Sequence, residues 1–393
     1  MAQNTANTGG GSRKIAAGAA IVTKSKRFAV DLFCGCGGIS SGLRDAGFRI
    51  LAGADMERHY IQTYQENFPE AESLRIDLAA VPPKNFGSSL KIRPGELDLL
   101  AGGPPCQGFS KNVPRSRRTS DLANNLLIRT FLDYCEYLRP KMILMENVAE
   151  MRNGFDQSYT SEIGERLTTL GYSVQHSILN AADYGVPQRR RRAFFLAAAD
   201  GAPIKFPQPT HSKPGDQISL PGIEKKSNHL SVWEAISDLP SLLHGTGSQP
   251  CEYISRPRNT FQRKMRNASG KVMNHVARKL RPRQLERLSS LEPGQGHKNL
   301  PVHLRTKSGY SGAYGRLTKE MVAPTITRWV FHPGSGRFGH PVDIRTITMR
   351  ETARIQGFKD SFVLIGSYTQ QAGQLGNAVP PLLIEKICNG LPS

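Results

Sequence analysis

Short apolar runs and stretches with helical spacing alternate along the first half of the chain. The run at 27–33 predicts a strand, the apolar positions of 39–48 recur at helical spacing, and 49–54 predicts the next strand. The same alternation predicts further strands at 97–101, 142–145 and 193–197, and further helices at 58–68, 122–138 and 161–170. Strands separated by helices indicate an α/β fold with a mostly parallel sheet covered on both faces.

The regular pattern ends near residue 200, where prolines and basic runs replace it. We therefore expect a catalytic, cofactor-binding domain at 27–199 and a smaller, irregular second domain at 200–345. Helical spacing at 349–356 and 379–387 predicts that 346–393 returns to the first domain. Residues 1–26 are small, polar and basic, which predicts a disordered tail.

The composition narrows the class of partner. Lys and Arg number 52 against 32 Asp and Glu, a net charge of +20, which indicates a partner rich in phosphates; a basic surface kept for solubility is the alternative. No apolar run approaches the roughly 20 residues of a membrane-spanning helix, so we expect no membrane partner. The six cysteines are too few for a disulfide scaffold, and no secretory signal is apparent. These features predict a cytoplasmic protein.

A glycine-rich turn follows the first predicted strand. Gly35, Gly37 and Gly38 let the backbone approach a ligand closely, but their spacing differs from the G-x-G-x-x-G of dinucleotide-binding proteins. Asp55, about 20 residues further on, is placed to bind a ribose, and Asp77 could bind an adenine amino group. Taken singly, each carboxylate is explained more simply as a helix cap or a solvated loop residue.

One of the cysteines is a candidate nucleophile, and two others invite a metal-site interpretation. Cys34 and Cys36 are one residue apart, which is not the spacing of a structural zinc site, so we expect no metal. Cys106 lies between Pro104-Pro105 and Gln107-Gly108, at the end of an apolar strand. A thiolate there is placed as a nucleophile at a cleft, although most free cysteines are small hydrophobic residues.

Two further segments place charge at predicted strand ends. Glu146-Asn147-Val148 ends an apolar strand, where a partly desolvated carboxylate can share a proton. Four arginines, 189–192, precede another strand. Because alternate residues entering a strand point in opposite directions, Arg190 and Arg192 share a side and could both face the pocket.

Taken together, these segments resemble the C5 DNA-cytosine methyltransferases of bacterial restriction–modification systems. The resemblance covers about 27–198 and 345–393 and leaves the middle of the chain unmatched. One departure is Phe358-Lys359-Asp360, where relatives often have proline. The matching blocks, in family order, are 31–38, 102–110, 146–148, 188–192, 350–358 and 376–381.

The resemblance implies a Rossmann-like domain that uses S-adenosyl-L-methionine and releases S-adenosyl-L-homocysteine. It implies that Cys106 attacks C6 of a flipped-out cytosine, that Glu146 contacts N3 and the amino group, and that Arg192, with Arg190, binds O2. The implied cofactor-binding residues are Phe33, Gly35, Gly37, Gly38, Asp55, Met56, Asp77, Gly102, Pro104, Asn377 and Val379. The implied DNA contacts, on a loop that closes over the duplex, are Gln107, Ser110, Arg115, Arg117 and Arg118.

The implied partner is double-stranded DNA, with 200–345 as the target-recognition domain and a monomer that acts separately from any cognate restriction endonuclease. The implied location is the bacterial cytoplasm, with nucleoid association through DNA binding. Methylation of cytosine in transfer RNA by a relative of the same family remains an alternative, as does a catalytically silent DNA-binding protein. A nicotinamide oxidoreductase fits the glycine spacing less well.

Overall fold

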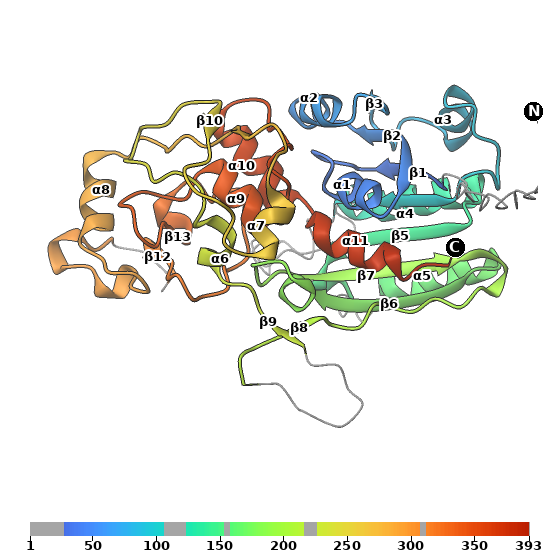
Figure 1. The fold of residues 1–393 in the computed structure, drawn as a ribbon. Coiled ribbons are helices and arrows are strands. Elements are labelled where there is room, and N and C mark those ends of the chain that lie inside the picture. The colour runs from blue at the N-terminus through green and yellow to red at the C-terminus, as the bar shows by residue number, and fades with distance from the viewer. Residues whose placement is uncertain (1–26, 106–122, 153–157, 216–225, 307–311, 393) are drawn as a thin grey trace, which may run out of the picture.

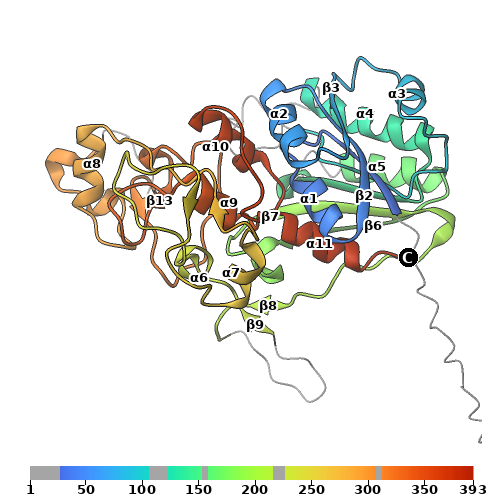
Figure 2. The same cartoon turned by 45° about the horizontal axis from the view of Figure 1, so that its top comes forward.

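The computed structural model describes residues 27–105, 123–152, 158–215, 226–306 and 312–392, and it forms two lobes (Figure 1). One lobe contains the large sheet and the other contains α8, α9 and α10, with the last helix of the chain lying across the sheet lobe (Figure 2). Within the described residues, no helix is both long and apolar enough to cross a membrane. The predicted tail, 1–26, lies outside the described residues.

The large sheet has seven strands in the order β3-β2-β1-β4-β5-β7-β6. All neighbouring pairs from β3 to β5 are parallel, while β7 runs antiparallel to both β5 and β6. This confirms the predicted α/β fold and its mostly parallel sheet. The strands are β1 Arg27–Leu32, β2 Phe48–Asp55, β3 Glu72–Arg75, β4 Leu99–Gly102, β5 Met142–Val148, β6 Ser173–Asn180 and β7 Arg191–Ala198.

Helices cover both faces of this sheet, because successive strand residues point to opposite faces. Ala29 belongs to the core under α1, α2 and α11, whereas its neighbour Val30 belongs to the core under α3, α4 and α5. A Cβ on Gly42 would lie 2.5 Å from the Cβ of Ile384, so glycine lets α1 and α11 pack closely. These helices are α1 Gly38–Asp45, α2 Arg58–Asn67, α3 Pro83–Ser89, α4 Ala123–Leu138, α5 Ser158–Thr169 and α11 Pro381–Asn389.

The second lobe is built from short elements joined by long connections. Its strands pair in twos, and buried arginines rather than a long sheet connect its segments; Arg316, Arg345, Arg350 and Arg354 are at most 5 % exposed. Its helices are α6 Val232–Ile236, α7 Thr260–Met265, α8 Pro282–Ser289, α9 Met349–Ile355 and α10 Tyr368–Asn377. Its strand pairs are β10 Cys251–Glu252 with β11 Lys271–Val272, and β12 Gly315–Arg316 with β13 Arg337–Gly339; β8 His211–Ser212 pairs with β9 Ser227–Asn228 beside it.

The C-terminal segment, 346–392, contacts both lobes. Arg350 and Arg354, both on α9, bond to residues of the second lobe, including Met273 and Asp238. The same segment also contacts the sheet lobe, since α11 packs against α1 and Gln374, on α10, bonds to Thr63 of α2. Residues 346–392 therefore connect the two lobes.

Candidate active site

The glycine turn closes tightly between β1 and α1. Phe33, Gly35 and Gly37 have φ values of 56°, 54° and 98°, so the chain reverses through the left-handed region that glycine favours. The buried Asp31 fixes the turn, because its Oδ2 accepts hydrogen bonds from the backbone nitrogen (3.1 Å) and the hydroxyl (2.7 Å) of Ser40. Burial raises the pKa of Asp31 to about 7.

The chain before α11 packs against this turn. A Cβ on Gly38 would lie 2.4 Å from the carbonyl oxygen of Val379, so the absence of a side chain permits the contact. Asn377, two residues earlier, is exposed and donates from Nδ2 to the hydroxyl of Tyr60 at 2.7 Å. Gly38, near the start of the sequence, and Asn377 and Val379, near its end, are all predicted to bind the cofactor. The structure brings these three residues into one region.

The loop after β2 joins the same region through Asp55. The Asp55 carboxylate accepts hydrogen bonds from the backbone nitrogens of Gly35 (3.0 Å) and Glu57 (2.9 Å), and burial raises its pKa. Its neighbour Met56 is 58 % exposed and can pack against a ligand. Asp77 is exposed, and its Oδ1 accepts from the backbone nitrogen of Ala79 at 3.0 Å. The bond of Asp77 is local to its loop, whereas Asp55 also connects the loop after β2 to the glycine turn 20 residues earlier.

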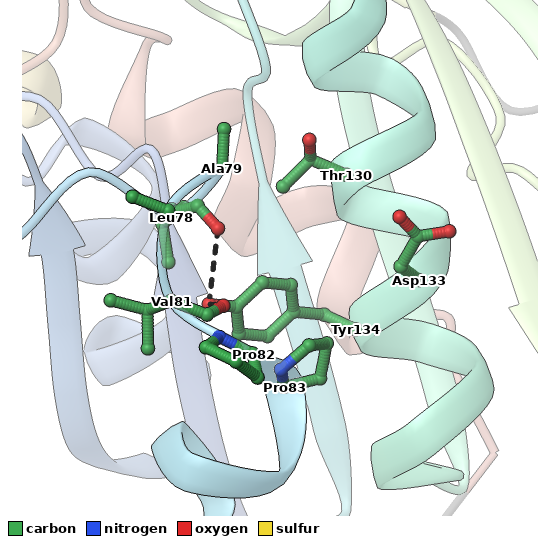
Figure 3. A pocket seen from close by; sticks show the side chains of 9 residues that line it. Leu78, Ala79, Val81, Pro82, Pro83, Thr130, Asp133 and Tyr134 are labelled. Carbon is green, nitrogen blue, oxygen red and sulfur yellow. Dashed lines mark hydrogen bonds between the residues drawn. The ribbon is translucent and has the colours of Figure 1, made fainter.

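A pocket of about 160 Å³ lies between α4 and the residues that follow Asp77 in the chain (Figure 3). The hydroxyl of Tyr134, from α4, donates to the carbonyls of Leu78 (3.3 Å) and Val81 (2.9 Å). These contacts fix the loop after β3 against α4, next to the residue expected to bind adenine. The lining residues are Leu78, Ala79, Ala80, Val81, Pro82, Pro83, Thr130, Asp133 and Tyr134.

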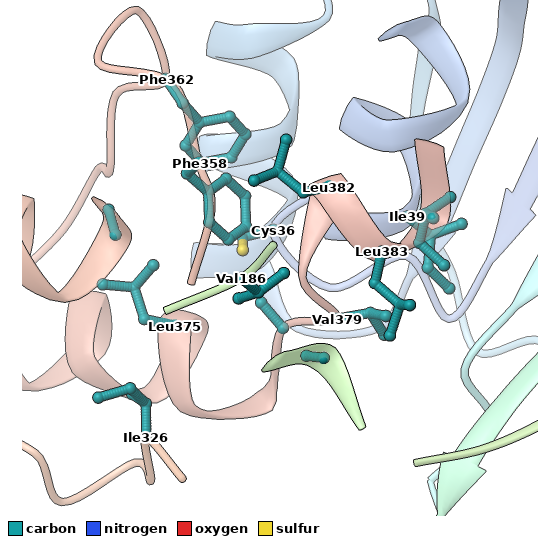
Figure 4. Packing of buried hydrophobic residues seen from close by; sticks show 14 of the residues in the cluster. Cys36, Ile39, Val186, Ile326, Phe358, Phe362, Leu375, Val379, Leu382 and Leu383 are labelled. Carbon is teal, nitrogen blue, oxygen red and sulfur yellow. The ribbon is translucent and has the colours of Figure 1, made fainter. Parts of the chain in front are cut away.

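The cysteines of the glycine turn are buried. Cys34 is 6 % exposed and Cys36 2 % exposed, and burial raises the pKa of the Cys36 thiol to about 12. Cys36 packs among the residues that join the turn to the C-terminal segment, including Leu375 and Val379 (Figure 4). Both thiols are protonated core residues at neutral pH.

Glu146 and Arg192 form the charged pair of the site. Nε of Arg192 lies 2.9 Å from Oε1 of Glu146, with side chains 17 % and 10 % exposed. Burial raises the pKa of Glu146, while the Arg192 and Arg190 cations lower it; burial is the largest contribution. A Cβ on Gly103 would be 3.4 Å from Oε2 of Glu146, so the chain after β4 runs alongside this carboxylate.

Asn147 connects this strand to the loop that leads to the predicted nucleophile. Its Nδ2 donates to the carbonyl of Pro104 at 3.0 Å, and its Oδ1 accepts from the nitrogen of Val148 at 2.8 Å. The backbone two residues before Cys106 is therefore held beside Glu146. Cys106 itself and the predicted DNA contacts Gln107, Ser110, Arg115, Arg117 and Arg118 lie outside the described residues.

Arg190 has an environment different from the expected one. It is 1 % exposed, and its guanidinium donates to the carbonyls of Ile326 (3.1 Å) and Gly376 (3.0 Å). It lies close enough to Glu146 to affect its pKa, but the hydrogen bonds found for it join three chain segments. We therefore interpret Arg190 as a residue that positions the site, and only Arg192 of the pair bonds to Glu146.

Several residues beside the site were not predicted. Gln188 accepts from the nitrogen of Ile326 at 2.8 Å and donates to Oε1 of Gln356 at 2.7 Å. The segment 323–328, from the unmatched middle of the chain, is fixed in this way to the residues before β7. Its irregular, polar sequence carries no periodicity that could have placed it there.

The sheet order, with β7 antiparallel between β5 and the edge strand, defines a Rossmann-like α/β fold, and the turns described above lie at its carboxyl edge, where ligands of such sheets bind. Residues 28–392 match the family described as C-5 cytosine-specific DNA methylase, and the chain belongs to this family. Its activity is methylation of C5 of cytosine in DNA, and the family uses S-adenosylmethionine.

Individual relatives agree with this assignment. The chain is 33 % identical to the type II methyltransferase M.AgeI of Thalassovita gelatinovora over 90 % of this chain and 96 % of that one. It is 34 % identical to M.DdeI of Desulfomicrobium norvegicum, over 91 % and 86 %. A putative DNA modification methyltransferase from an Escherichia coli prophage has a similar fold, with a TM-score of 0.72 and 23 % identity over 93 % of this chain and 98 % of that one.

Proposed function

We propose that the protein methylates C5 of a cytosine that leaves a DNA duplex at a defined sequence, with Cys106 as nucleophile and Glu146 and Arg192 as the groups that bind the base. The observation that supports this most directly is the Glu146–Arg192 pair at the carboxyl edge of the sheet. The bond from Asn147 to Pro104 fixes the approach of the chain to Cys106 beside that pair.

C5 of cytosine is a poor nucleophile, so the protein must first activate the ring. A bond forms between the Cys106 sulfur and C6, and the electron pair of the C5–C6 double bond becomes available at C5. Glu146 donates a proton or hydrogen bond to N3 and accepts one from the amino group, which offsets the charge that develops in the ring. Burial raises its pKa, which favours a carboxyl group that shares a proton with the base.

Arg192 has two tasks in this mechanism. Its guanidinium donates to O2 of the base. Its ion pair with Glu146 also keeps the Glu146 carboxylate oriented. After C5 has taken the methyl group, a base removes the C5 proton, the C6–sulfur bond breaks and Cys106 leaves as thiolate. S-adenosylmethionine, when bound, supplies an electrophilic methyl group and becomes S-adenosylhomocysteine.

The turn at 33–38 is the proposed cofactor site, because it lies at the carboxyl edge of the sheet, where ligands of such sheets bind, and because Gly38 lets the Val379 backbone pack against it. We propose that Phe33 and Met56 pack against the cofactor, Asp55 binds its ribose and Asp77 its adenine amino group. Asn377 and Val379 border the methionine end. The contributing backbone positions are Gly35, Gly37, Gly38, Gly102 and Pro104.

The net charge of +20 supports DNA as the partner, and the second lobe, opposite the sheet lobe, is proposed to recognise the target sequence. We propose that Gln107, Ser110, Arg115, Arg117 and Arg118 contact the DNA during closure. By analogy with the relatives named type II methyltransferases, a separate endonuclease with the same target is expected.

The nucleophile is tested with DNA that contains 5-fluorocytosine, because fluorine cannot leave C5 as a proton does. Wild-type protein with cofactor should form a covalent adduct, and Cys106→Ser should form none while it still binds cofactor. Cys251→Ser, at a partly exposed cysteine of the second lobe, is the matched control and should keep adduct formation. Absence of an adduct with wild type rejects the assignment, and methyl transfer to transfer RNA but not duplex DNA favours the RNA alternative.

A further inference from the structure

Two neighbouring aromatic rings lie between two arginines in the second lobe. The guanidinium of Arg328 lies 5.7 Å from the ring centre of Trp329, and that ring lies 5.9 Å from the ring of Phe331. On the other side of Phe331, the Arg278 guanidinium lies 4.6 Å from the ring centre. We call Arg278, Arg328, Trp329 and Phe331 the cation–aromatic row.

The middle of this row is open to a ligand. Trp329 is 53 % exposed and Arg328 is exposed, whereas Phe331 is 7 % exposed and anchors the row in the core. The exposed indole presents an aromatic face on which another ring can stack. Within the described residues, no carboxylate lies within 4.0 Å of the guanidinium of Arg278 or Arg328.

The row is fixed to the catalytic lobe through the segment that precedes it. The Thr325 hydroxyl donates to the carbonyl of Arg189 at 2.7 Å, and Arg190 donates to the carbonyl of Ile326 at 3.1 Å. A Cβ on Gly376 would lie 2.2 Å from the nitrogen of Arg328, so this backbone lies against the residue before Asn377. Ile326 packs in the core between the lobes (Figure 4).

This attachment places Trp329 beside the candidate active site. Arg189 and Arg190 lie immediately before β7, on which Arg192 binds Glu146. The Arg328 cation also lies close enough to Tyr60 to lower the pKa of its hydroxyl, against burial that raises it to about 12; Tyr60 accepts the hydrogen bond of Asn377. The backbone before the exposed indole is thus hydrogen-bonded to the residues that precede β7 and packs against Gly376, next to Asn377.

We infer that Trp329 stacks on a nucleobase next to the cytosine that leaves the duplex, and that Arg328 and Arg278 contact the phosphates on either side. Stacking on an aromatic ring suits every base and stabilises a strand whose normal stacking is interrupted. The charges of Arg328 and of Arg278, whose guanidinium also donates to the carbonyl of Phe331 at 2.9 Å, give an affinity that depends on salt but not on sequence. This inference rests on the proposed function, because it requires duplex DNA in the site.

The test uses the full chain, S-adenosylhomocysteine and a short duplex containing a cytosine that the wild-type protein methylates, identified by bisulfite sequencing of DNA from expressing cells. Trp329→Ala should weaken binding about 10-fold without changing its salt dependence, and Trp329→Phe should restore most of the affinity. Arg328→Gln should reduce the steepness of log affinity against log salt concentration by about 0.9. The control Arg49→Gln lies at the start of β2, at the other end of this strand from Asp55, and should leave the slope unchanged.

Fluorescence separates a DNA contact from a structural role, because the chain has two tryptophans. In Trp233→Phe, Trp329 is the sole emitter and should be strongly quenched by the duplex, while in Trp329→Phe the remaining Trp233 should respond weakly. Unchanged Trp329 emission in bound protein, or wild-type affinity in a folded Trp329→Ala protein, overturns the inference about Trp329 but leaves the proposed function standing. Failure of the wild-type protein to methylate any duplex overturns the proposed function as well.

Discussion

Arg192 and Glu146 are brought together by the reversed direction of β7. Arg192 is paired with Val148 across the antiparallel β5–β7 ladder, and Glu146 lies two residues from Val148 on the same face of β5. The Nε to Oε1 distance is 2.9 Å. If β7 were parallel to β5, its first residues would lie at the opposite edge of the sheet. The direction of one strand therefore brings an arginine to the carboxyl edge, where the ligands of such sheets bind.

Glu146→Gln tests whether this carboxyl group takes part in proton transfer. The amide can hydrogen-bond to the base but cannot donate or take up its proton, so kcat should fall by about 10² to 10⁴-fold. Because burial raises the pKa of Glu146, ionisation of this group opposes folding at neutral pH. The variant should therefore unfold at the same or a higher denaturant concentration at pH 7.

Glu165→Gln on α5, an exposed carboxylate, is the control and should change neither turnover nor stability. Near wild-type kcat in Glu146→Gln, measured by transfer of labelled methyl groups to duplex DNA, would contradict the assigned role. A large loss of stability would instead show that the ion pair with Arg192 mainly supports the fold.

Asn147→Ala tests whether the bond to Pro104 positions the nucleophile. Loss of that bond frees the backbone two residues before Cys106, and a displacement of about 1 Å at a reacting group can cost about 10²-fold in rate. We expect slower adduct formation with 5-fluorocytosine and an unchanged affinity for cofactor. A rate equal to that of wild type would mean that the loop is positioned by other contacts.

Asp31 gives a specific pH dependence of stability. Its pKa is raised from 3.8 to about 7 in the folded protein, so the folded state binds the proton more tightly than the unfolded state. The stabilisation is complete below pH 4 and is lost as the pH rises to about 7, by at most about 4 kcal/mol. Asp31→Asn cannot ionise and should remove this part of the pH dependence.

The check is the difference in free energy of unfolding between Asp31→Asn and wild type, measured by urea denaturation at pH 5 and pH 8. The variant should gain relative to wild type at the higher pH. An identical difference at both pH values would show that Asp31 titrates normally in the folded protein.

The sequence predicted the parts of the fold whose pattern is local. Strands and helices around 27–68 and 97–145 agree with the structure to within a few residues, because buried strands and amphipathic helices have distinct apolar periods. Strand β6 was missed because it is an edge strand of mixed exposure, with the polar residues Gln175 and His176 in water. The direction of β7 was not predictable, since no local pattern distinguishes parallel from antiparallel strands.

In the site, too, the residue types were predictable from local pattern, but their long-range contacts were not. Glu146 and Arg192 were identified as candidates because charged residues border apolar strands, but their contact depends on the direction of β7. The structural role of Arg190 depends on Ile326 and Gly376, which are 136 and 186 residues away. The attachment of 323–328 to Gln188 is also a long-range contact without a sequence period.

Buried charges connect α9 to the rest of the second lobe. Arg354 donates to Asp360 at 2.7 and 2.6 Å and to Asp238 at 3.0 Å, and all three side chains are 0 % exposed. Arg354→Met leaves two carboxylates buried with fewer partners, and breaking a buried pair in this way costs about 3–5 kcal/mol. Arg129→Met, at the exposed pair with Glu162, should cost less than about 1 kcal/mol.

Adding Asp360→Asn to Arg354→Met should recover part of the lost stability, because it removes one of the stranded charges. The measurement is urea denaturation of the four proteins at pH 7. If Arg354→Met is as stable as wild type, a well-packed apolar side chain replaces the ion network, as it can when desolvation outweighs attraction. In that case the network would not hold α9 in place, and the packing of Ile355 and Phe358 would have to do so.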